Sequence, residues 1–314
     1  MKTRLESRFE GAILGLAIGD ALGWPTEFLS LREIHARFGP EGVTDFVAAS
    51  RHPPGTYTDD TQMSIAVAEA LIEAGRKPLD VLMPVMARRF VEWARSPEND
   101  RAPGTACMAG CRNLAAGKDW RTAGNPGSKG CGSAMRAAPI GLYYHGDLAR
   151  VVEVGCASSL PTHGHRTAIA AAAGTAVAVA LLVEGAAPQD LVPRLLETTG
   201  SLDGDCAAKI RQVLSVLDKP PAEAMRILGD AWVGEEALAD ALYCFLRSPD
   251  DYRRTVLAAA NSNGDSDSIA CIAGAMSGAF NGIEAIPDRW RREVENADYL
   301  TDLAKRLYAA SIAP

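Results

Sequence analysis

Two short acidic segments, far apart in the chain, hold the side chains best suited to chemistry. Each contains two aspartates with hydroxyl side chains beside them, and each stands just before an alanine-rich stretch with helical spacing. These residues are Thr58, Asp59, Asp60, Asp265, Asp267 and Ser268. If the fold brings the segments together, like charges would disfavour ionisation of all the carboxyl groups. Bound divalent cations would remove that conflict, and oxygen ligands suit hard ions such as Mg²⁺ or Mn²⁺.

Each segment also has a simpler interpretation as a helix cap, in which a side-chain oxygen accepts from a free backbone amide of the first turn. The adjacent acids Asp59 and Asp60, flanked by threonines, exceed what one cap requires. In an extended loop, residues i and i+2 point the same way, so Asp265 and Asp267 would face one ion. The glycine and terminal glutamate of a calcium-binding EF-hand loop do not follow at the required offsets.

The composition limits the class of protein. The chain has 314 residues, of which 47% are hydrophobic, enough for one large domain or two small ones. Its formal net charge of −7 argues against non-specific nucleic-acid binding, which needs a basic surface. The seven cysteines form no CxxC pair and no cluster with histidine, so we expect free thiols in a reducing compartment.

Two apolar runs bear on membranes and secretion. Residues 11–18 follow basic residues, as in a signal peptide, but acidic residues crowd the run and no small-residue cleavage pattern stands out. Residues 168–183 fall short of the ~20 residues that a membrane-spanning helix needs. We therefore expect a cytoplasmic protein that has no membrane partner.

Helical periodicity dominates the chain, and alternating Val/Ile/Thr-rich runs are nearly absent, so we predict no sheet and one all-α domain over residues 1–314. Gly11 and Gly15, and Gly274 and Gly278, recur at i, i+4, which indicates helices whose backbones approach closely. The predicted helices cover residues 4–22, 61–74, 78–94, 104–115, 133–143, 147–158, 167–184, 189–198, 205–217, 222–231, 235–246, 251–260, 268–283 and 297–310.

Five ordered motifs carry a family resemblance. They are residues 15–23 followed by Glu27, residues 58–63, residues 130–141, Thr162 with His163, and residues 264–268. In this order and spacing, from about residue 9 to residue 287, the chain resembles the ADP-ribosylglycohydrolases, the family of the dinitrogenase reductase-activating glycohydrolase. The resemblance implies a single compact all-α domain of orthogonally packed helices that holds two divalent cations, Mg²⁺ or Mn²⁺.

The resemblance also assigns roles to residues. It makes Thr58, Asp59, Asp60, Asp265, Asp267 and Ser268 the metal ligands, and Glu27, Asp59 and Asp267 catalytic. The family more often has threonine where Ser268 stands, and serine keeps the hydroxyl; Asn263 stands where glycine is common. Glu27 would lie near the anomeric carbon of bound ADP-ribose for general acid/base or water-positioning work. Without the resemblance, Glu27 is interpreted as a solvated loop residue after Pro25.

The segment 130–136 is predicted to open a helix, where backbone amides suit a phosphate group. The resemblance implies that this segment binds the diphosphate. The alternative is a glycine-rich turn capped by Ser133. The resemblance places His163 beside the ribose or diphosphate as a hydrogen-bond partner. The alternative is a purely structural role. Some family members carry an acid where Ala102 stands, so Asp100, two residues earlier, is a candidate in its place. The predicted substrate-binding residues are Gly130, Gly132, Ser133, Met135, His163 and Asp100.

Three classes of function remain open from the sequence. The first is a metal-dependent hydrolase that releases ADP-ribose from a modified arginine or serine of a protein, or from a small derivative such as O-acetyl-ADP-ribose. The second is a non-enzymatic ADP-ribose binder or crystallin-like relative, which intact acid pairs argue against because buried charge is costly. The third is a two-metal phosphohydrolase acting on a nucleotide. We expect a monomer.

Overall fold

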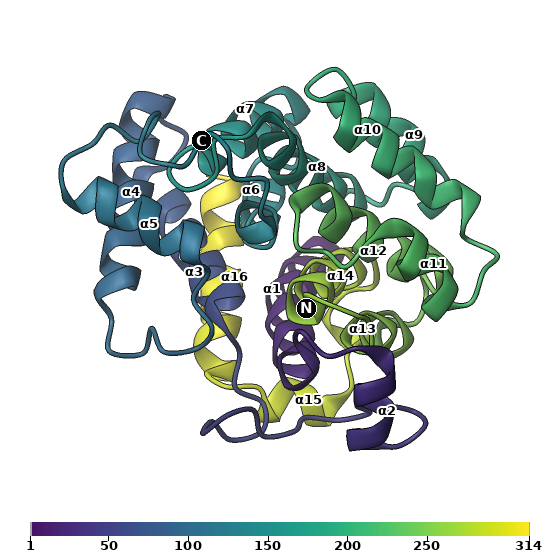
Figure 1. Cartoon of the computed structure of the whole chain (residues 1–314). Helices are drawn as coiled ribbons and strands as arrows, with labels where there is room; N and C mark the ends of the chain where they lie inside the picture. Colours follow the sequence, from purple (N-terminus) through teal and green to yellow (C-terminus); the bar gives the residue numbers. More distant parts are fainter. Residues whose placement is uncertain (1, 314) are drawn as a thin grey trace.

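The computed structural model describes residues 2–313, and over that range every regular element is helical (Figure 1). The earlier α-helices are α1 (Arg4–Gly23), α2 (Leu31–Phe38), α3 (Asp59–Ala74), α4 (Leu79–Arg95), α5 (Thr105–Ala115), α6 (Ala138–Tyr143), α7 (Leu148–Ser159) and α8 (Arg166–Val183). The later ones are α9 (Pro188–Thr199), α10 (Gly204–Gln212), α11 (Pro221–Leu228), α12 (Gly234–Arg247), α13 (Tyr252–Ala260), α14 (Ser266–Asn281), α15 (Asp288–Glu293) and α16 (Ala297–Ser311). Short 3-10 turns are η1 (Trp24–Thr26), η2 (Cys131–Ser133), η3 (Val213–Ser215) and η4 (Ile283–Ala285). The predicted all-α fold is confirmed; the predicted domain ends, residues 1 and 314, lie outside the described range.

The helices α1 and α14 pack against each other at the centre of the molecule, with α3–α5 on one side and α9–α11 on the other (Figure 1). Their glycines make this contact possible. A Cβ added at Gly19 would lie 2.0 Å from the Ala270 carbonyl oxygen, and one at Gly274 would lie 2.2 Å from the Gly15 oxygen. Any larger residue at either position would force the two backbones apart. The close approach expected from the glycine spacing is therefore confirmed.

The helix α8 is a core element. It is long and apolar enough, by composition, to cross a membrane, but 89% of its 18 residues are buried inside the protein. It packs against α6, α7, α12 and α14, and its many alanines allow these neighbours to approach closely. Elsewhere in the core, Arg136 is fully buried, with its guanidinium over the Phe90 ring.

The structure corrects several predicted helices. The single helix predicted over residues 133–143 is wrong: the chain forms η2, then an irregular turn, and α6 begins only at Ala138. Pro139 lacks an N–H group and is tolerated in the first turn of a helix but not in its interior. Residues 205–217 form α10 followed by η3, and the short helices α2 and α15 were not predicted. For α2 a signal was present, since Ser30 and Glu33 form a capping box.

Candidate active site

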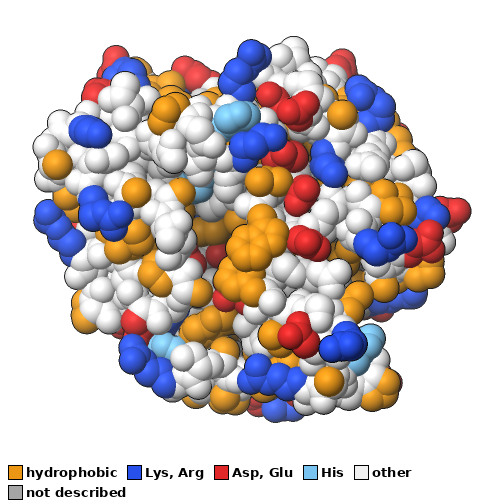
Figure 2. All heavy atoms as spheres, viewed as in Figure 1, with side chains coloured by type: hydrophobic (Ala, Val, Ile, Leu, Met, Phe, Trp, Pro, Cys, Tyr) orange, Lys and Arg blue, Asp and Glu red, His pale blue; other side chains and the backbone are white. Residues whose placement is uncertain are grey.

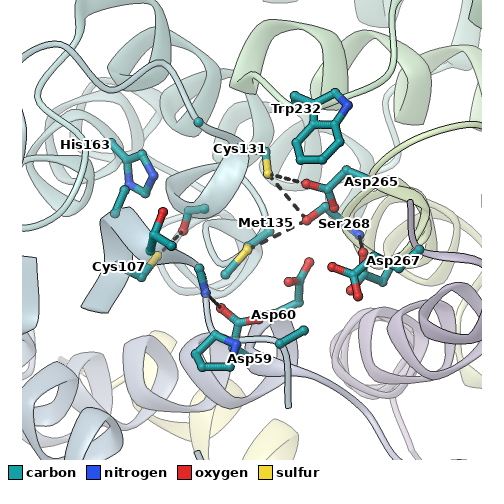
Figure 3. A pocket seen from close by; sticks show the side chains of 18 of the residues that line it. Asp59, Asp60, Cys107, Cys131, Met135, His163, Trp232, Asp265, Asp267 and Ser268 are labelled. Carbon is teal, nitrogen blue, oxygen red and sulfur yellow. Dashed lines mark hydrogen bonds between the residues drawn. The ribbon is translucent and has the colours of Figure 1, made fainter. Parts of the chain in front are cut away.

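The N-terminal ends of α3 and α14 meet at one cavity of about 520 Å³. One side, the acidic wall, consists of Glu27, Asp59, Asp60, Asp265, Asp267 and Ser268. The other side, the glycine wall, consists of Gly130, Gly132 and His163. Figure 3 shows His163 across the cavity from Asp265 and Asp267, with Met135 between the two walls. The distant acidic segments therefore converge as predicted.

Asp20, on α1, positions the start of α3. Its buried carboxylate accepts hydrogen bonds from the backbone N–H groups of Thr58 and Thr61, each at 3.0 Å, and from the Thr61 hydroxyl at 2.6 Å. Amides at a helix N-terminus bind an anion well because they lack partners inside the helix. Asp20 thus holds the turn that presents Asp59 and Asp60. Sequence analysis assigned Asp20 no role, although an acid inside an apolar helical run was a visible signal.

The contact between α1 and α14 positions the second acidic segment. A Cβ at Gly23 would lie 2.5 Å from the Asp267 Cα, so the end of α1 touches the first turn of α14. Asp265 is the N-cap residue and Asp267 lies inside the helix, so the segment is not the extended loop that was expected. Both carboxylates still line the cavity, because the first turn of α14 faces it.

The acidic wall is electrostatically unfavourable without a counter-charge. Burial raises the pKa of Asp59 to about 8, and burial together with the nearby Asp265 charge raises the pKa of Glu27 to about 9. Burial, followed by the charges of neighbouring acids, also raises the pKa of Asp60 and of Asp267 well above the ordinary range. At neutral pH several of these groups hold protons unless a cation neutralises them.

The donor set of the acidic wall fits hard divalent cations. The Oδ1 atom of Asp60 is buried and has no hydrogen-bond partner, so it remains available to an ion. Within residues 2–313, no three His, Cys, Asp or Glu side chains already converge closely enough to hold an ion by themselves.

The glycine wall is built differently from its predicted form. Residues 131–133 form the 3-10 turn η2 and do not open an α-helix, so the predicted helix N-terminus is wrong. The glycines give the wall its close contact with the imidazole: a Cβ at Gly132 would lie 2.9 Å from His163 Cε1 and 2.8 Å from Cys107 Sγ. The first amides of such a turn have no partner within it and can donate to an anion.

A hydrogen-bond relay fixes the His163 side chain. Arg136 donates through NH2 to the Thr162 hydroxyl at 2.7 Å, and that hydroxyl lies 2.8 Å from His163 Nδ1. Because the guanidinium only donates, the hydroxyl proton is available to Nδ1 or to the Ser159 carbonyl at 3.4 Å. When it bonds to Nδ1, which is the closer of the two, Nε2 carries the ring hydrogen beside Gly130 and Gly132. Burial, followed by the Arg136 charge, lowers the pKa of His163 to about 3, so the ring is neutral.

Three predicted site residues lie outside the cavity lining. Thr58 is buried beside it, where its hydroxyl accepts from the Asp60 N–H at 3.3 Å and caps α3. The Ser133 hydroxyl bonds instead to Ser159 Oγ at 2.9 Å and to the Ala168 carbonyl at 3.4 Å. Asp100 forms an ion pair with Arg51, whose hydrogen bond lowers the pKa of Asp100, and the loop reaches the cavity only from Ala102 onward, through Ala102, Pro103 and Gly104. The structure does not bring Asp100 to the site.

Several lining residues were absent from the predicted set. Cys131 donates its thiol to Asp265 Oδ2 at 2.9 Å, and burial, followed by the Asp265 charge, raises the pKa of that thiol. Phe28 and Trp232 also line the cavity. All of the cysteines are free thiols, as predicted.

Comparison with known proteins agrees with this geometry. The ADP-ribosylglycohydrolase family model matches residues 1–314. ADP-ribosylhydrolase ARH3 of Danio rerio is 30% identical over 353 residues, covering 96% of this chain and 90% of the relative. ADP-ribosylarginine hydrolase Tri1 of Serratia proteamaculans is 27% identical over 316 residues, covering 95% of this chain and 78% of the relative.

The likeness extends to three dimensions. A solved structure described as an ADP-ribosylglycohydrolase-related protein complex superposes with a TM-score of 0.81 at 30% identity. The superposition covers 99% of this chain and 100% of the other. Since the family model spans the sequence from end to end and a solved relative shares the whole fold, the chain belongs to the ADP-ribosylglycohydrolase family.

Proposed function

We propose that this protein is a metal-dependent hydrolase that cleaves the glycosidic bond between ADP-ribose and a protein side chain, releasing ADP-ribose. The observation that carries the proposal is the convergence of five acids, from α3, α14 and the loop after α1, on one cavity. Relatives across the family are named as hydrolases of ADP-ribosyl groups, which supports the same reaction class.

The acidic wall would hold two divalent cations, Mg²⁺ or Mn²⁺. Asp59, Asp60, Asp265 and Asp267 would supply carboxylate oxygens, and Ser268 would supply a hydroxyl. The predicted ligand Thr58 lies outside the cavity lining, where its hydroxyl caps α3. When bound, the ions would neutralise the cluster and provide Lewis-acid and water-activating chemistry. The partnerless Asp60 oxygen supports this assignment.

Glu27 is the proposed proton donor. Burial is the largest cause of its raised pKa, and burial favours the protonated form, which can protonate a leaving atom. The bond between the anomeric carbon and the side-chain nitrogen or oxygen breaks as Glu27 gives its proton to that atom. Water adds its hydroxyl to the anomeric carbon, and its remaining proton returns to Glu27. Carboxylates nearby favour the positive charge that develops on the sugar.

The glycine wall is proposed to bind the diphosphate. Gly130, Gly132 and His163 line the cavity, and the amides of η2 and the His163 Nε2–H would be its neutral donors. An anion is stabilised there without a lysine or arginine, and none lines the cavity among the described residues.

The test is to incubate the protein with arginine-linked and serine-linked ADP-ribosyl peptides, with Mg²⁺ and with a chelator. Free ADP-ribose released only with Mg²⁺ supports the proposal. Release of AMP would favour a phosphohydrolase instead. Tight ADP-ribose binding without turnover of either peptide, or of O-acetyl-ADP-ribose, would identify a non-enzymatic binder.

A further inference from the structure

Two exposed aromatic rings stand at the mouth of the cavity. Phe28 and Trp232 stack with ring centroids 4.5 Å apart and an interplanar angle of 7°. Each leaves more than half of its surface exposed, 51% and 55%, and both line the cavity. Figure 2 shows hydrophobic side chains gathered over the hollow near the centre of this face. Large apolar groups left exposed beside a pocket mark a binding surface more often than a packing accident.

The backbone that holds this pair in place adopts an unfavourable conformation at Phe28. Phe28 has a φ of +61°, an uncommon conformation for a bulky residue, and its N–H donates to the Gly264 carbonyl at 2.6 Å. Trp232 lies in the loop before α12, where Gly234 N–H donates to the Lys129 carbonyl at 2.8 Å. Backbone conformations of this kind persist where the surroundings enforce them, often at functional sites.

The pair lies at the leaving-group end of the cavity. Phe28 directly follows Glu27, the proposed proton donor. Figure 3 shows Trp232 beside Asp265 and Ser268, on the opposite side from His163, which we assign to the diphosphate. A group leaving the anomeric carbon near Glu27 would therefore pass the aromatic rings, whereas the adenosine end would lie toward or beyond the glycine wall.

The charge of the cavity selects among leaving groups. Five carboxyl groups line it and no Lys or Arg of the described chain does, so the lining has no cationic side chain that would repel a cationic leaving group. The guanidinium of an arginine-linked substrate is planar and cationic, and it stacks on tryptophan by a cation–π interaction. A serine-linked substrate offers neither a plane nor a charge to the rings.

We propose that Phe28 and Trp232 form an aromatic platform for the guanidinium of arginine-linked ADP-ribose, so that the protein prefers arginine N-glycosides to serine O-glycosides. This inference rests on the proposed function and specifies its substrate class. Trp232 acts here as a specificity residue that contacts the leaving group.

The experiment measures kcat/KM for arginine-linked and serine-linked ADP-ribosyl peptides, with Mg²⁺, in wild type, Trp232→Ala and Trp232→Phe. Binding of free ADP-ribose is measured by calorimetry in the same proteins. Leu214→Ala is the matched control, because it also removes a half-exposed apolar side chain but lies outside the cavity lining. Far-ultraviolet circular dichroism melts check folding.

We expect wild type to prefer the arginine peptide. Trp232→Ala should lower kcat/KM for that peptide about 5-fold to about 30-fold, and Trp232→Phe should retain most of it. The serine peptide, the affinity for ADP-ribose, and all values for Leu214→Ala should change less than about 2-fold, since no cation–π contact is lost.

Other results would overturn the inference. An equal loss on both peptides would mean a general structural role. Weaker binding of free ADP-ribose in Trp232→Ala would mean that the rings stack on adenine. A wild-type preference for the serine peptide would contradict the platform yet leave the proposed hydrolase intact, whereas no ADP-ribose release from either peptide would contradict the hydrolase itself.

Discussion

The two walls of the cavity differ in their chemistry: one is lined by carboxyl groups and the other by neutral hydrogen-bond donors. The acidic wall presents carboxyl groups, and burial raises the pKa of two of them, Asp59 and Asp267, which disfavours their ionised form. The glycine wall presents backbone amides and a neutral imidazole, none of which titrates near neutral pH. In the proposed function, the first wall is completed by cations and the second binds an anion. One ligand carrying both vicinal hydroxyls and a diphosphate matches this division.

The same contrast appears in how the walls are supported. The acids are carried by α3 and α14, and these helices are positioned by α1 through Asp20 and through glycine contacts at the backbone. The glycine wall is a short turn that rests against α8 and α12, and side-chain hydrogen bonds from Arg136 to the Gly132 carbonyl and the Thr162 hydroxyl help to hold it. Changes to the first wall should therefore affect chemistry with little loss of fold, and changes to the second should affect ligand orientation.

The largest effect should come from removing one acid. Asp267→Asn, and separately Asp60→Asn, should lower turnover by more than about 100-fold, since even residues outside the first ligand shell of a metal site contribute about 10- to 100-fold. The metal-free protein should not be destabilised, because a buried like-charge conflict is relieved. Peptide turnover with Mg²⁺ and thermal melts with a chelator measure the two quantities.

The control for this experiment is Asp100→Asn, which removes an acid that pairs with Arg51 outside the cavity. It should leave turnover nearly unchanged. Wild-type turnover in Asp267→Asn would mean that the acids only cap their helices and that the two walls do not differ in the way described.

Residue types predict the acidic wall better than the glycine wall. Either aspartate pair alone is also explained by helix capping, but their shared placement before helices, together with the family resemblance, assigns Asp59, Asp60, Asp265 and Asp267 to one site, and all four line the cavity. The prediction that Asp265 and Asp267 lie in an extended loop was wrong, because α14 begins at Ser266 and not at Ser268. The side chains nevertheless face one cavity.

The remaining features depend on contacts between distant loops. Phe28 and Trp232 come from different loops, and no spacing in the sequence links them. The role of Thr162 depends on Arg136, a residue whose complete burial composition alone does not predict. Asp100 looked suitable by type and position, but Arg51 holds it at the surface. Long-range pairing of this kind is decided by packing and not by local pattern.

A smaller effect should follow from breaking the relay behind the glycine wall. Thr162→Val keeps the shape of the side chain but removes the hydroxyl between Arg136 and His163. We expect KM to rise about 10-fold, with little change in kcat, because one buried partner is lost. Nitrogen-15 NMR of the imidazole should change from the Nε2–H tautomer to a mixture.

Thr162→Ser is the matched variant, since it restores the hydroxyl and should restore both KM and the tautomer. A variant that loses stability but keeps the Nε2–H tautomer would show that Thr162 only supports packing. In that case the neutral donor of the glycine wall would be fixed by burial alone.

The smallest effect should be on stability, which should depend on pH with opposite sign for the two walls. A raised pKa in the folded protein means that the acids bind protons more tightly than in the unfolded chain, so metal-free stability falls as pH rises toward about 9. The pKa of His163 is lowered to about 3, so between 3 and 6.5 the unfolded chain binds the extra proton and stability rises with pH.

Urea unfolding with a chelator, at pH 7.5 and 5.5, compares wild type with His163→Gln. The contribution of the acidic wall is the same in both proteins and cancels when their free energies of unfolding are subtracted. From pH 7.5 to pH 5.5, wild type should lose about 1 kcal/mol more of this free energy than the variant. If the free energy of unfolding changes equally with pH in both proteins, His163 takes up its proton in the folded state. The glycine wall would then titrate as well, and the contrast with the acidic wall would not hold.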